Sequence, residues 1–212
     1  MNTLAALPLR EFLAAVAAPT PTPGGGAVAA LAAACGTALA EMVATLPRTR
    51  HNAPEDRVAL DQVLAPIKVL RARLETLADL DSESFDRLMA GLRLPKGTDD
   101  ENAARRAAIN DATKDAALVP LETVRVCADV LKLMETVAGA GNRAAGSDLF
   151  VGIGLVRAAA EGAAANVRAN LETLADPAFT FSATRRLTSA LDDVMRSAHA
   201  ACGALQGGNT SG

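Results

Sequence analysis

The residues Pro21-Thr22-Pro23-Gly24-Gly25-Gly26 form a turn whose residue types could contact a ligand directly. A helix of small residues is expected directly after this turn, at 27–46. The prolines hold the approach extended, and the glycines lack a Cβ, so the backbone can lie against a bound group. The first N–H groups of a helix have no partner within it and carry partial positive charge. The turn is therefore a candidate site for an anion or a polar ring. It lacks the spacing of a phosphate-binding loop. The alternative is that the turn only ends one segment and starts the next helix, without binding a ligand.

A second candidate lies in the middle of the chain, at Asp81, Glu83 and Phe85. On a helix Asp81 and Phe85 share a face. Asp81 and Glu83 are about 200° apart on the same helix, so they cannot line one pocket as a simple pair. Asp81 is a candidate for a carboxylate that accepts a proton or stabilises a cation. The alternative is a solvated acid on an amphipathic helix, with Phe85 in the core.

Further polar residues follow at turns and on helices. Lys96 lies in a turn and could donate a proton or hold an anionic tail, or be an ordinary surface lysine. Asp148 follows Ser147 at a helix start, where a carboxylate can accept two hydrogen bonds from a guanidine-like ring edge or serve as an ordinary helix-start acid. Asn166 and Asn170 are one turn apart, and such positions indicate either a pocket lining or a hydrogen bond between helices, of which we favour the second.

Composition limits the class of protein. The 212 residues suit one domain, and 50% of them are hydrophobic although only 2% are aromatic. Alanine supplies much of the apolar content and buries little surface per residue, so the helices must pack closely. Burial against a second subunit would add to the apolar surface removed from water, and an oligomer is expected.

Charge, cysteine and histidine content argue against other classes. The net charge of −3 gives no field for nucleic acid, and few aromatic residues are present for base stacking. Cys35, Cys127 and Cys202 are odd in number and widely spaced, which indicates small buried side chains in a reducing compartment. His51 and His199 have no metal-ligand spacing around them, so no metal site is expected.

The N-terminus has a short apolar run at 12–18 that imitates a secretory signal, but Glu11 interrupts its basic side. An amphipathic helix at 7–17 explains this run better. The apolar stretch at 27–40 is too short for a membrane span, and no membrane segment is expected. We therefore expect a cytoplasmic protein.

The helical periodicity predicts an all-α fold, an antiparallel bundle of long, kinked helices in a single domain at 1–206, with a flexible tail at 207–212. Helices are expected at about 7–17, 27–46, 54–92, 99–137, 148–174 and 177–205. Pro66 should kink or divide the third of these, and Pro120 should kink the fourth.

Side chains at three helix starts are candidates for capping. Asn52 precedes the third helix, and Ser147 precedes the fifth. Thr98 and Glu101 form a capping box for the fourth.

The turn at 21–26 and a series of later motifs resemble the cyclodeaminase/cyclohydrolase family of tetrahydrofolate enzymes. The motifs occur in the family's order over roughly residues 10–175: Pro21 to Ala30, Met42-Val43-Ala44, Asp81-x-Glu83-Ser84-Phe85-Asp86, Leu94-Pro95-Lys96, Val119-Pro120-Leu121, Gly141-Asn142, Ser147-Asp148 and Asn166-Val167-x-x-Asn170. The closest resemblance is to stand-alone bacterial cyclohydrolases, which are about this length and have no fused formiminotransferase domain.

The resemblance implies a homodimer that hydrolyses 5,10-methenyltetrahydrofolate to 10-formyltetrahydrofolate, with no cofactor beyond the folate and no metal. It implies Asp81 and Lys96 as catalytic residues. It also implies a set of substrate-binding residues: Pro23, Gly24, Gly25, Gly26, Arg48, Arg50, Asn142, Ser147, Asp148, Asn166 and Asn170.

The chain departs from the family's pattern after the second helix. Members often read Asn-Leu-Thr there, followed by a glycine and two basic residues, whereas this chain reads Thr45-Leu46-Pro47-Arg48-Thr49-Arg50-His51. The basic residues of the family's pattern are kept, but the residues that form the turn are different. Two alternative functions stay open: a 5-formiminotetrahydrofolate cyclodeaminase that releases ammonia, and a non-catalytic folate-binding helical oligomer.

Overall fold

The computed structural model describes residues 3–47 and 53–207, and within these ranges the chain is helical with no strand. The α-helices are α1 (Leu9–Ala17), α2 (Gly25–Thr45), α3 (Pro54–Leu92), α4 (Asp99–Ala140), α5 (Gly146–Glu172) and α6 (Pro177–Gly207). Short 3-10 turns, η1 (Leu4–Ala6) and η2 (Arg143–Ala145), precede α1 and α5. The all-α prediction is confirmed, and α3 continues through Pro66 as one helix.

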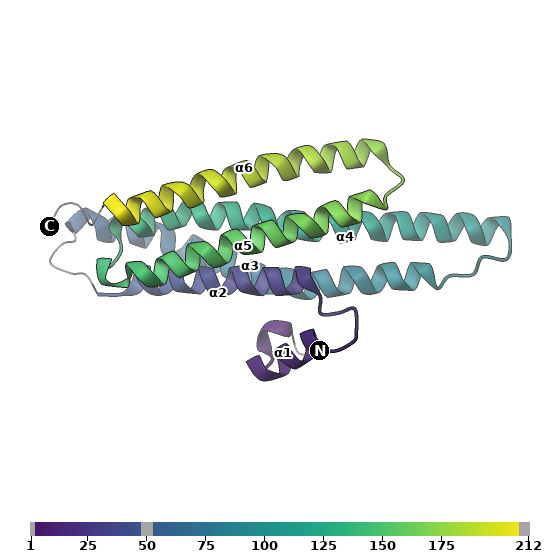
Figure 1. Cartoon of the computed structure of the whole chain (residues 1–212), viewed down its shortest axis with the longest axis horizontal. Helices are drawn as coiled ribbons and strands as arrows, with labels where there is room; N and C mark the ends of the chain where they lie inside the picture. The colour runs from purple at the N-terminus through teal and green to yellow at the C-terminus, as the bar shows by residue number, and fades with distance from the viewer. Residues whose placement is uncertain (1–2, 48–52, 208–212) are drawn as a thin grey trace.

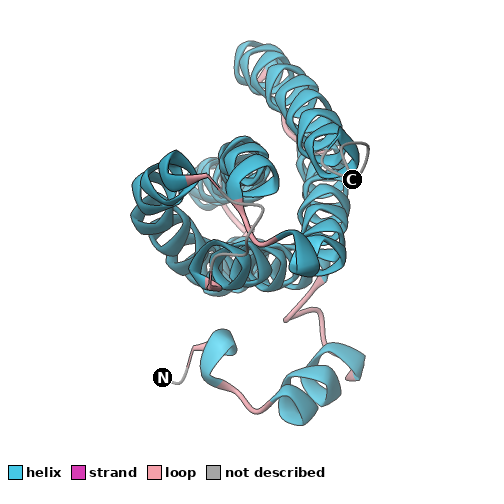
Figure 2. Cartoon of the chain, turned by 90° about the vertical axis from the view of Figure 1, so that its left-hand side faces the viewer, coloured by secondary structure: helices cyan, strands magenta, loops and turns pink. Residues whose placement is uncertain are grey.

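Helices α2 to α6 lie along a common long axis as an antiparallel bundle (Figure 1). The α3–α4 hairpin extends beyond the start of α2, and α1 lies outside the bundle on the side of α2 (Figures 1 and 2). The longest helices, α3 and α4, therefore carry the residues that reach past the shorter ones.

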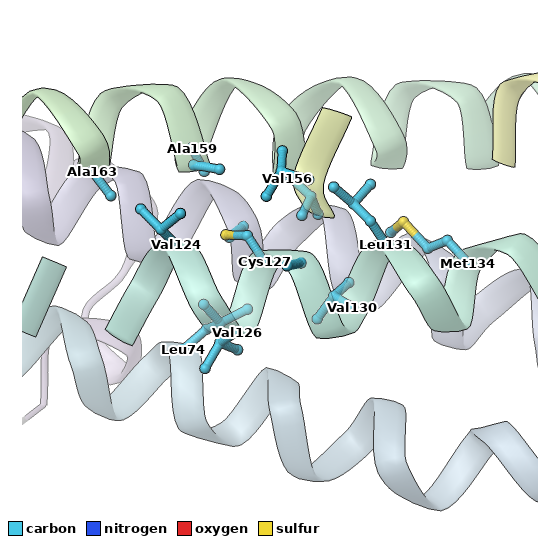
Figure 3. Packing of buried hydrophobic residues seen from close by; sticks show 14 of the residues in the cluster. Leu74, Val124, Val126, Cys127, Val130, Leu131, Met134, Val156, Ala159 and Ala163 are labelled. Atoms are coloured by element: carbon cyan, nitrogen blue, oxygen red, sulfur yellow. The ribbon is translucent and has the colours of Figure 1, made fainter. Parts of the chain in front are cut away.

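The core runs along α4, which packs against α2, α3, α5 and α6. Figure 3 shows Val124 and Leu131 of α4 on the side of Val156 in α5. On another side of α4, Val126 lies beside Leu74 of α3. All five side chains are buried, and dispersion contacts among them hold the three helices in register.

Small residues bring α2 and α5 into backbone contact. A Cβ built on Gly36 would lie 2.6 Å from the Gly152 carbonyl oxygen, and one built on Gly152 would lie 2.9 Å from the Gly36 carbonyl oxygen. Neither position can hold a side chain without moving the helices apart. The close approach expected for an alanine-rich bundle is therefore present at this crossing.

Pro120 lies within α4 and is buried. Proline has no N–H, so the Ala116 carbonyl loses its usual helical donor. Asn170 of α5 replaces that donor, because its Nδ2 donates to the Ala116 oxygen at 2.8 Å. The hydrogen bond between helices that the sequence favoured is thus made by Asn170.

The caps agree with the sequence in one case and not in another. Thr98 Oγ1 accepts the Glu101 N–H at 3.2 Å, and Glu101 Oε2 accepts the Thr98 N–H at 3.0 Å, which confirms the capping box. The prediction that Ser147 caps the fifth helix is wrong, because α5 already begins at Gly146. Asn142 caps instead: its Oδ1 accepts the Ala144 N–H at 2.9 Å and begins η2.

Two predicted boundaries fall at the edges of the described residues. Helix α3 begins at Pro54 with Ala53 as its N-cap, and Asp56 Oδ2 accepts the Ala53 N–H at 2.7 Å. Asn52, the predicted cap, lies outside the described residues. Helix α6 ends at Gly207, and the remainder of the predicted tail, 208–212, also lies outside them.

Two helical stretches, Gly25–Thr45 and Arg143–Glu172, are long and apolar enough to cross a membrane, so the expectation that no segment has this length is wrong. The bundle buries 56% of the first apolar window and 44% of the second. Both stretches pack against other helices of the bundle, and we interpret them as core helices.

The cysteines differ in environment. Cys127 is buried, as expected, and desolvation raises the pKa of its thiol to about 12, so the thiol stays neutral. Cys35 is exposed and Cys202 is half-buried, so the prediction of buried side chains holds only for Cys127. All three are free thiols.

Candidate active site

The carboxylate of Asp81, on α3, lies against the first turn of α2. It accepts a hydrogen bond from the Ala27 N–H. A Cβ built on Gly26 would lie 2.6 Å from Asp81 Oδ2 and nearer still to Oδ1, so only glycine leaves room for this carboxylate. The anion seat predicted at this helix start is therefore occupied by a side chain of the same chain.

Two opposing effects act on the Asp81 carboxyl. Burial raises its pKa above the ordinary value, because desolvation disfavours the charged form. The Ala27 N–H acts in the other direction by donating to the charged form. Burial has the larger effect, so the pKa of Asp81 is raised, and its carboxylate accepts a proton more readily than that of an exposed aspartate.

Asn166 of α5 reaches the same place. Its Nδ2 would lie 3.7 Å from a Cβ built on Gly25, and it donates to the Gly162 oxygen of its own helix at 3.0 Å. The structure thus brings together the glycine turn, which follows Pro23, the Asp81 carboxylate and the Asn166 amide. They come from three elements that are far apart in the sequence.

Lys96 is not part of this group within one chain. It lies exposed in the turn between α3 and α4. Asp81 is 11 residues before Leu92, the last residue of α3, which is about 16 Å along the helix axis. Lys96 therefore lies at the tip of the hairpin, away from Asp81 along α3.

Asn142, Ser147 and Asp148 lie at the opposite end of α2. Asn142 Nδ2 donates to the Pro47 oxygen at 3.0 Å, just after α2 ends. Helix α2 has 21 residues, which is a length of about 30 Å. The predicted substrate-binding residues therefore form two groups separated by the length of α2.

The second group borders a cavity of about 270 Å³ that Asn142 and Ser147 line together with Val43 and Phe150. Asp148 is exposed in the first turn of α5. Arg48 and Arg50, also predicted to bind substrate, lie outside the described residues.

Sequence reasoning missed two partners near Asp81. The Ala27 N–H is one, although its position in the first turn of α2 was a usable signal. The other is Asp79, whose Oδ1 accepts the Leu4 N–H at 2.8 Å. Nothing in the spacing indicated this second contact, because it joins residues 75 positions apart. Among the described residues, no group of three or more His, Cys, Asp or Glu is placed to hold a metal ion.

Comparison with known proteins agrees with the resemblance. Residues 8–189 match the family described as Formiminotransferase-cyclodeaminase. The chain is 40% identical over 183 residues to a methenyltetrahydrofolate cyclohydrolase from Methylorubrum extorquens, covering 86% of this chain and 88% of that protein. It is 32% identical over 186 residues to a formimidoyltransferase-cyclodeaminase from Sus scrofa, of which it spans only 34%.

The fold agrees as well. A crystal structure of a formiminotetrahydrofolate cyclodeaminase from Thermotoga maritima matches with a TM-score of 0.85 and 28% identity, covering 96% of this chain and 98% of that one. The helical bundle is therefore a known fold. The chain belongs to the formiminotransferase-cyclodeaminase family.

Proposed function

We propose that this protein hydrolyses 5,10-methenyltetrahydrofolate to 10-formyltetrahydrofolate. The observation that carries the proposal is the half-buried Asp81 carboxyl, with its raised pKa, seated against a glycine turn at a helix start. The 40% identity to a cyclohydrolase, over most of both chains, supports this reaction above the others.

The one-carbon bridge of the substrate is an amidinium-like cation. A water oxygen adds to the bridge carbon, and the Asp81 carboxylate accepts the proton that this water loses. The bond from the carbon to N5 then breaks while the added hydroxyl loses its proton and becomes the formyl oxygen. N5 takes up one proton, the formyl group stays on N10, and one proton is released to solvent overall. A carboxylate beside the cation also stabilises it before water adds.

The surrounding residues position the substrate in this scheme. Gly24 and Gly25 present backbone without side chains, so a flat ring can approach the start of α2 beside the Asp81 carboxylate, which fills the space next to Gly26. Asn166 supplies an amide that can hydrogen-bond to the ring edge. This hydrolysis involves addition of water, cleavage of the C–N5 bond and proton transfers, with no redox step, and it requires no cofactor beyond the folate.

A homodimer accounts for the separation of the two residue groups. Helices α2 and α5 expose apolar side chains, among them Met42, Phe150 and Val151. A two-fold pairing in which α2 runs antiparallel to its copy brings the Asn142 end of one chain beside the Gly26 end of the other. Each complete site then takes residues from both chains.

We further propose a cytoplasmic location. The exposed thiol of Cys35 and the half-buried thiol of Cys202 are both free, which suits a compartment that keeps cysteines reduced. The substrate is also an intermediate of one-carbon metabolism.

The test is the loss of methenyltetrahydrofolate absorbance in the presence of purified protein, compared with buffer because this compound also hydrolyses unaided. A protein-dependent acceleration that Asp81→Asn removes supports the cyclohydrolase. No acceleration contradicts it.

The second candidate is 5-formiminotetrahydrofolate cyclodeaminase, which the structural match to the Thermotoga maritima protein favours. Its mark is ammonia release from the formimino substrate. Folate binding without either reaction indicates a non-catalytic folate-binding oligomer.

A further inference from the structure

Residues 3–24, here called the N-terminal strap, return to α3 at both of their ends. At the first end, the Leu4 N–H donates to Asp79 Oδ1 at 2.8 Å. At the second end, the strap leads into Gly26 and Ala27, which contact Asp81. The two anchors are therefore neighbours on one helix, and the strap closes a loop beside the candidate active site.

The middle of the strap is weakly held. Helix α1 has no buried residue, and Leu9 and Leu13 on its apolar stripe are 71% and 57% exposed. A cavity of about 410 Å³, lined by Phe12 of the strap and by Val28 and other apolar residues of α2, separates it from the bundle. Figure 2 shows α1 standing apart from the other helices. The strap is thus fixed mainly through its ends.

The seat of the strap on α3 is also imperfect. Ser82 lies one helical turn after Asp79, on the same face. Its hydroxyl is enclosed and has no hydrogen-bond partner among the described residues. A buried hydroxyl without a partner costs free energy, so an opening that let water reach Ser82 would be favourable by that amount. The Leu4–Asp79 hydrogen bond would oppose such an opening.

We propose that the N-terminal strap is a movable cover of the Gly26–Asp81 site and that Asp79 is the positioning residue that latches it closed. The inference rests on the proposed function of that site. The strap ends in the turn that contacts Asp81, so release of Leu4 loosens the turn that presents Gly26 and Ala27. Closure orders this turn around the bound folate and limits the entry of bulk water.

The rate of trypsin cleavage after Arg10 measures how often the strap opens, because Arg10 is the only Lys or Arg among residues 1–47. It lies exposed on α1, and its cleavage requires α1 to unfold or to leave its position. With the intact protein and 10-formyltetrahydrofolate as the probe, we expect folate to slow cleavage after Arg10. The slowing approaches about 100-fold at 100 times the Kd if folate binds only the closed form.

Substitutions at Asp79 separate a latch from a general structural role. Asp79→Ala should speed cleavage after Arg10 and raise KM for methenyltetrahydrofolate, with kcat nearly unchanged. Asp79→Asn keeps an acceptor oxygen and should restore both values towards wild type. Asp86→Ala, which removes an exposed acid from the same helix, is the matched control and should change neither.

A second pair of variants tests the donor side in case Asp79→Ala does not fold. Leu4→Pro removes the N–H at the first position of a 3-10 turn, where proline fits, and Leu4→Ala controls for the lost side chain. Faster cleavage in Leu4→Pro than in Leu4→Ala supports the latch.

Two results overturn the cover. One is cleavage after Arg10 that folate does not alter in an enzyme that turns over. The other is an unchanged KM in Asp79→Ala. Failure of the proposed function looks different: the wild type shows neither turnover nor folate binding, while the cleavage rates of the Asp79 variants still report whether the latch exists.

Discussion

The Asp81 carboxylate lies in the space that a side chain on Gly26 would need, so these two residues determine each other's identity. A larger residue at 26 displaces the carboxylate, and loss of the carboxylate leaves the Ala27 N–H without its acceptor. The glycine turn and the acidic motif of the middle helix therefore form one structural unit.

Gly26→Ala should remove most of the activity and destabilise the fold by about 1–3 kcal/mol, the usual cost of overpacking. Gly25→Ala is the matched control for stability, because its Cβ meets only Asn166 Nδ2 at an ordinary 3.7 Å. Urea unfolding and turnover of both variants check this expectation. Equal behaviour of the two variants contradicts the steric argument.

Asp81→Asn should lower kcat/KM for methenyltetrahydrofolate by about 10²–10⁴-fold, the usual contribution of a positioned acid or base. Folate affinity should change little, because Asn Oδ1 can still accept from the Ala27 N–H. Kinetics together with equilibrium binding separate these effects. A variant with full activity would exclude Asp81 as the catalytic carboxylate.

Asp81→Asn should also be more stable than wild type at pH 7. Burial raises the folded-state pKa of Asp81 above the unfolded value of about 3.9. Between these two pKa values the folded chain holds the extra proton, so the Asp81 contribution to stability falls as pH rises through that window. The destabilisation caused by the buried charge is absent below the unfolded pKa and complete above the folded pKa.

Melting temperatures of the two proteins at pH 7 and near pH 4 measure this effect. The difference should be largest at pH 7 and shrink towards the acidic end. A difference that does not depend on pH would have a cause other than the ionisation of Asp81.

Asn170→Ala should cost about 1–3 kcal/mol, because it leaves the buried Ala116 carbonyl without a donor. In a Pro120→Ala background the new N–H at 120 can bond to Ala116, so the same change should cost less. A double-mutant cycle by urea unfolding should give a coupling of about 0.5–3 kcal/mol. Additive effects would show that the proline and the asparagine act independently.

Mixing two inactive variants tests the shared site. Asp81→Asn and Asn142→Ala carry their changes at opposite ends of α2, so a mixed dimer should contain one site with both residues intact. After random exchange of subunits, about a quarter of wild-type activity should return. A mixture that stays inactive after exchange contradicts a site built from both chains.

Much of the helical pattern could be predicted from the sequence, because periodicity and local capping act over a few residues. The capping box at Thr98 and Glu101 is one example. The prediction for Ser147 was wrong because Asn142 opens a 3-10 turn upstream, and the helix then starts one residue before the serine.

The candidate site was predicted only in part. Gly26 and Asp81 were each selected from the sequence, but their contact depends on how far α2 and α3 slide past each other, and helix spacing does not contain that distance. The Leu4–Asp79 hydrogen bond was missed for the same reason. Asn170 was the easier case, since a proline in a helix requires a donor from elsewhere.

The return of the N-terminus to α3 has a consequence during synthesis of the chain on the ribosome. Leu4 and Asp79 are 75 positions apart, so at ordinary elongation rates the strap waits roughly 4–15 s for its anchor. Helix α2 waits longer for α5, against which it packs. Helix α3 covers one face of α2 as soon as it is made, but the face that packs against α5 stays open until later in translation. That apolar face of the nascent chain is where a chaperone would bind.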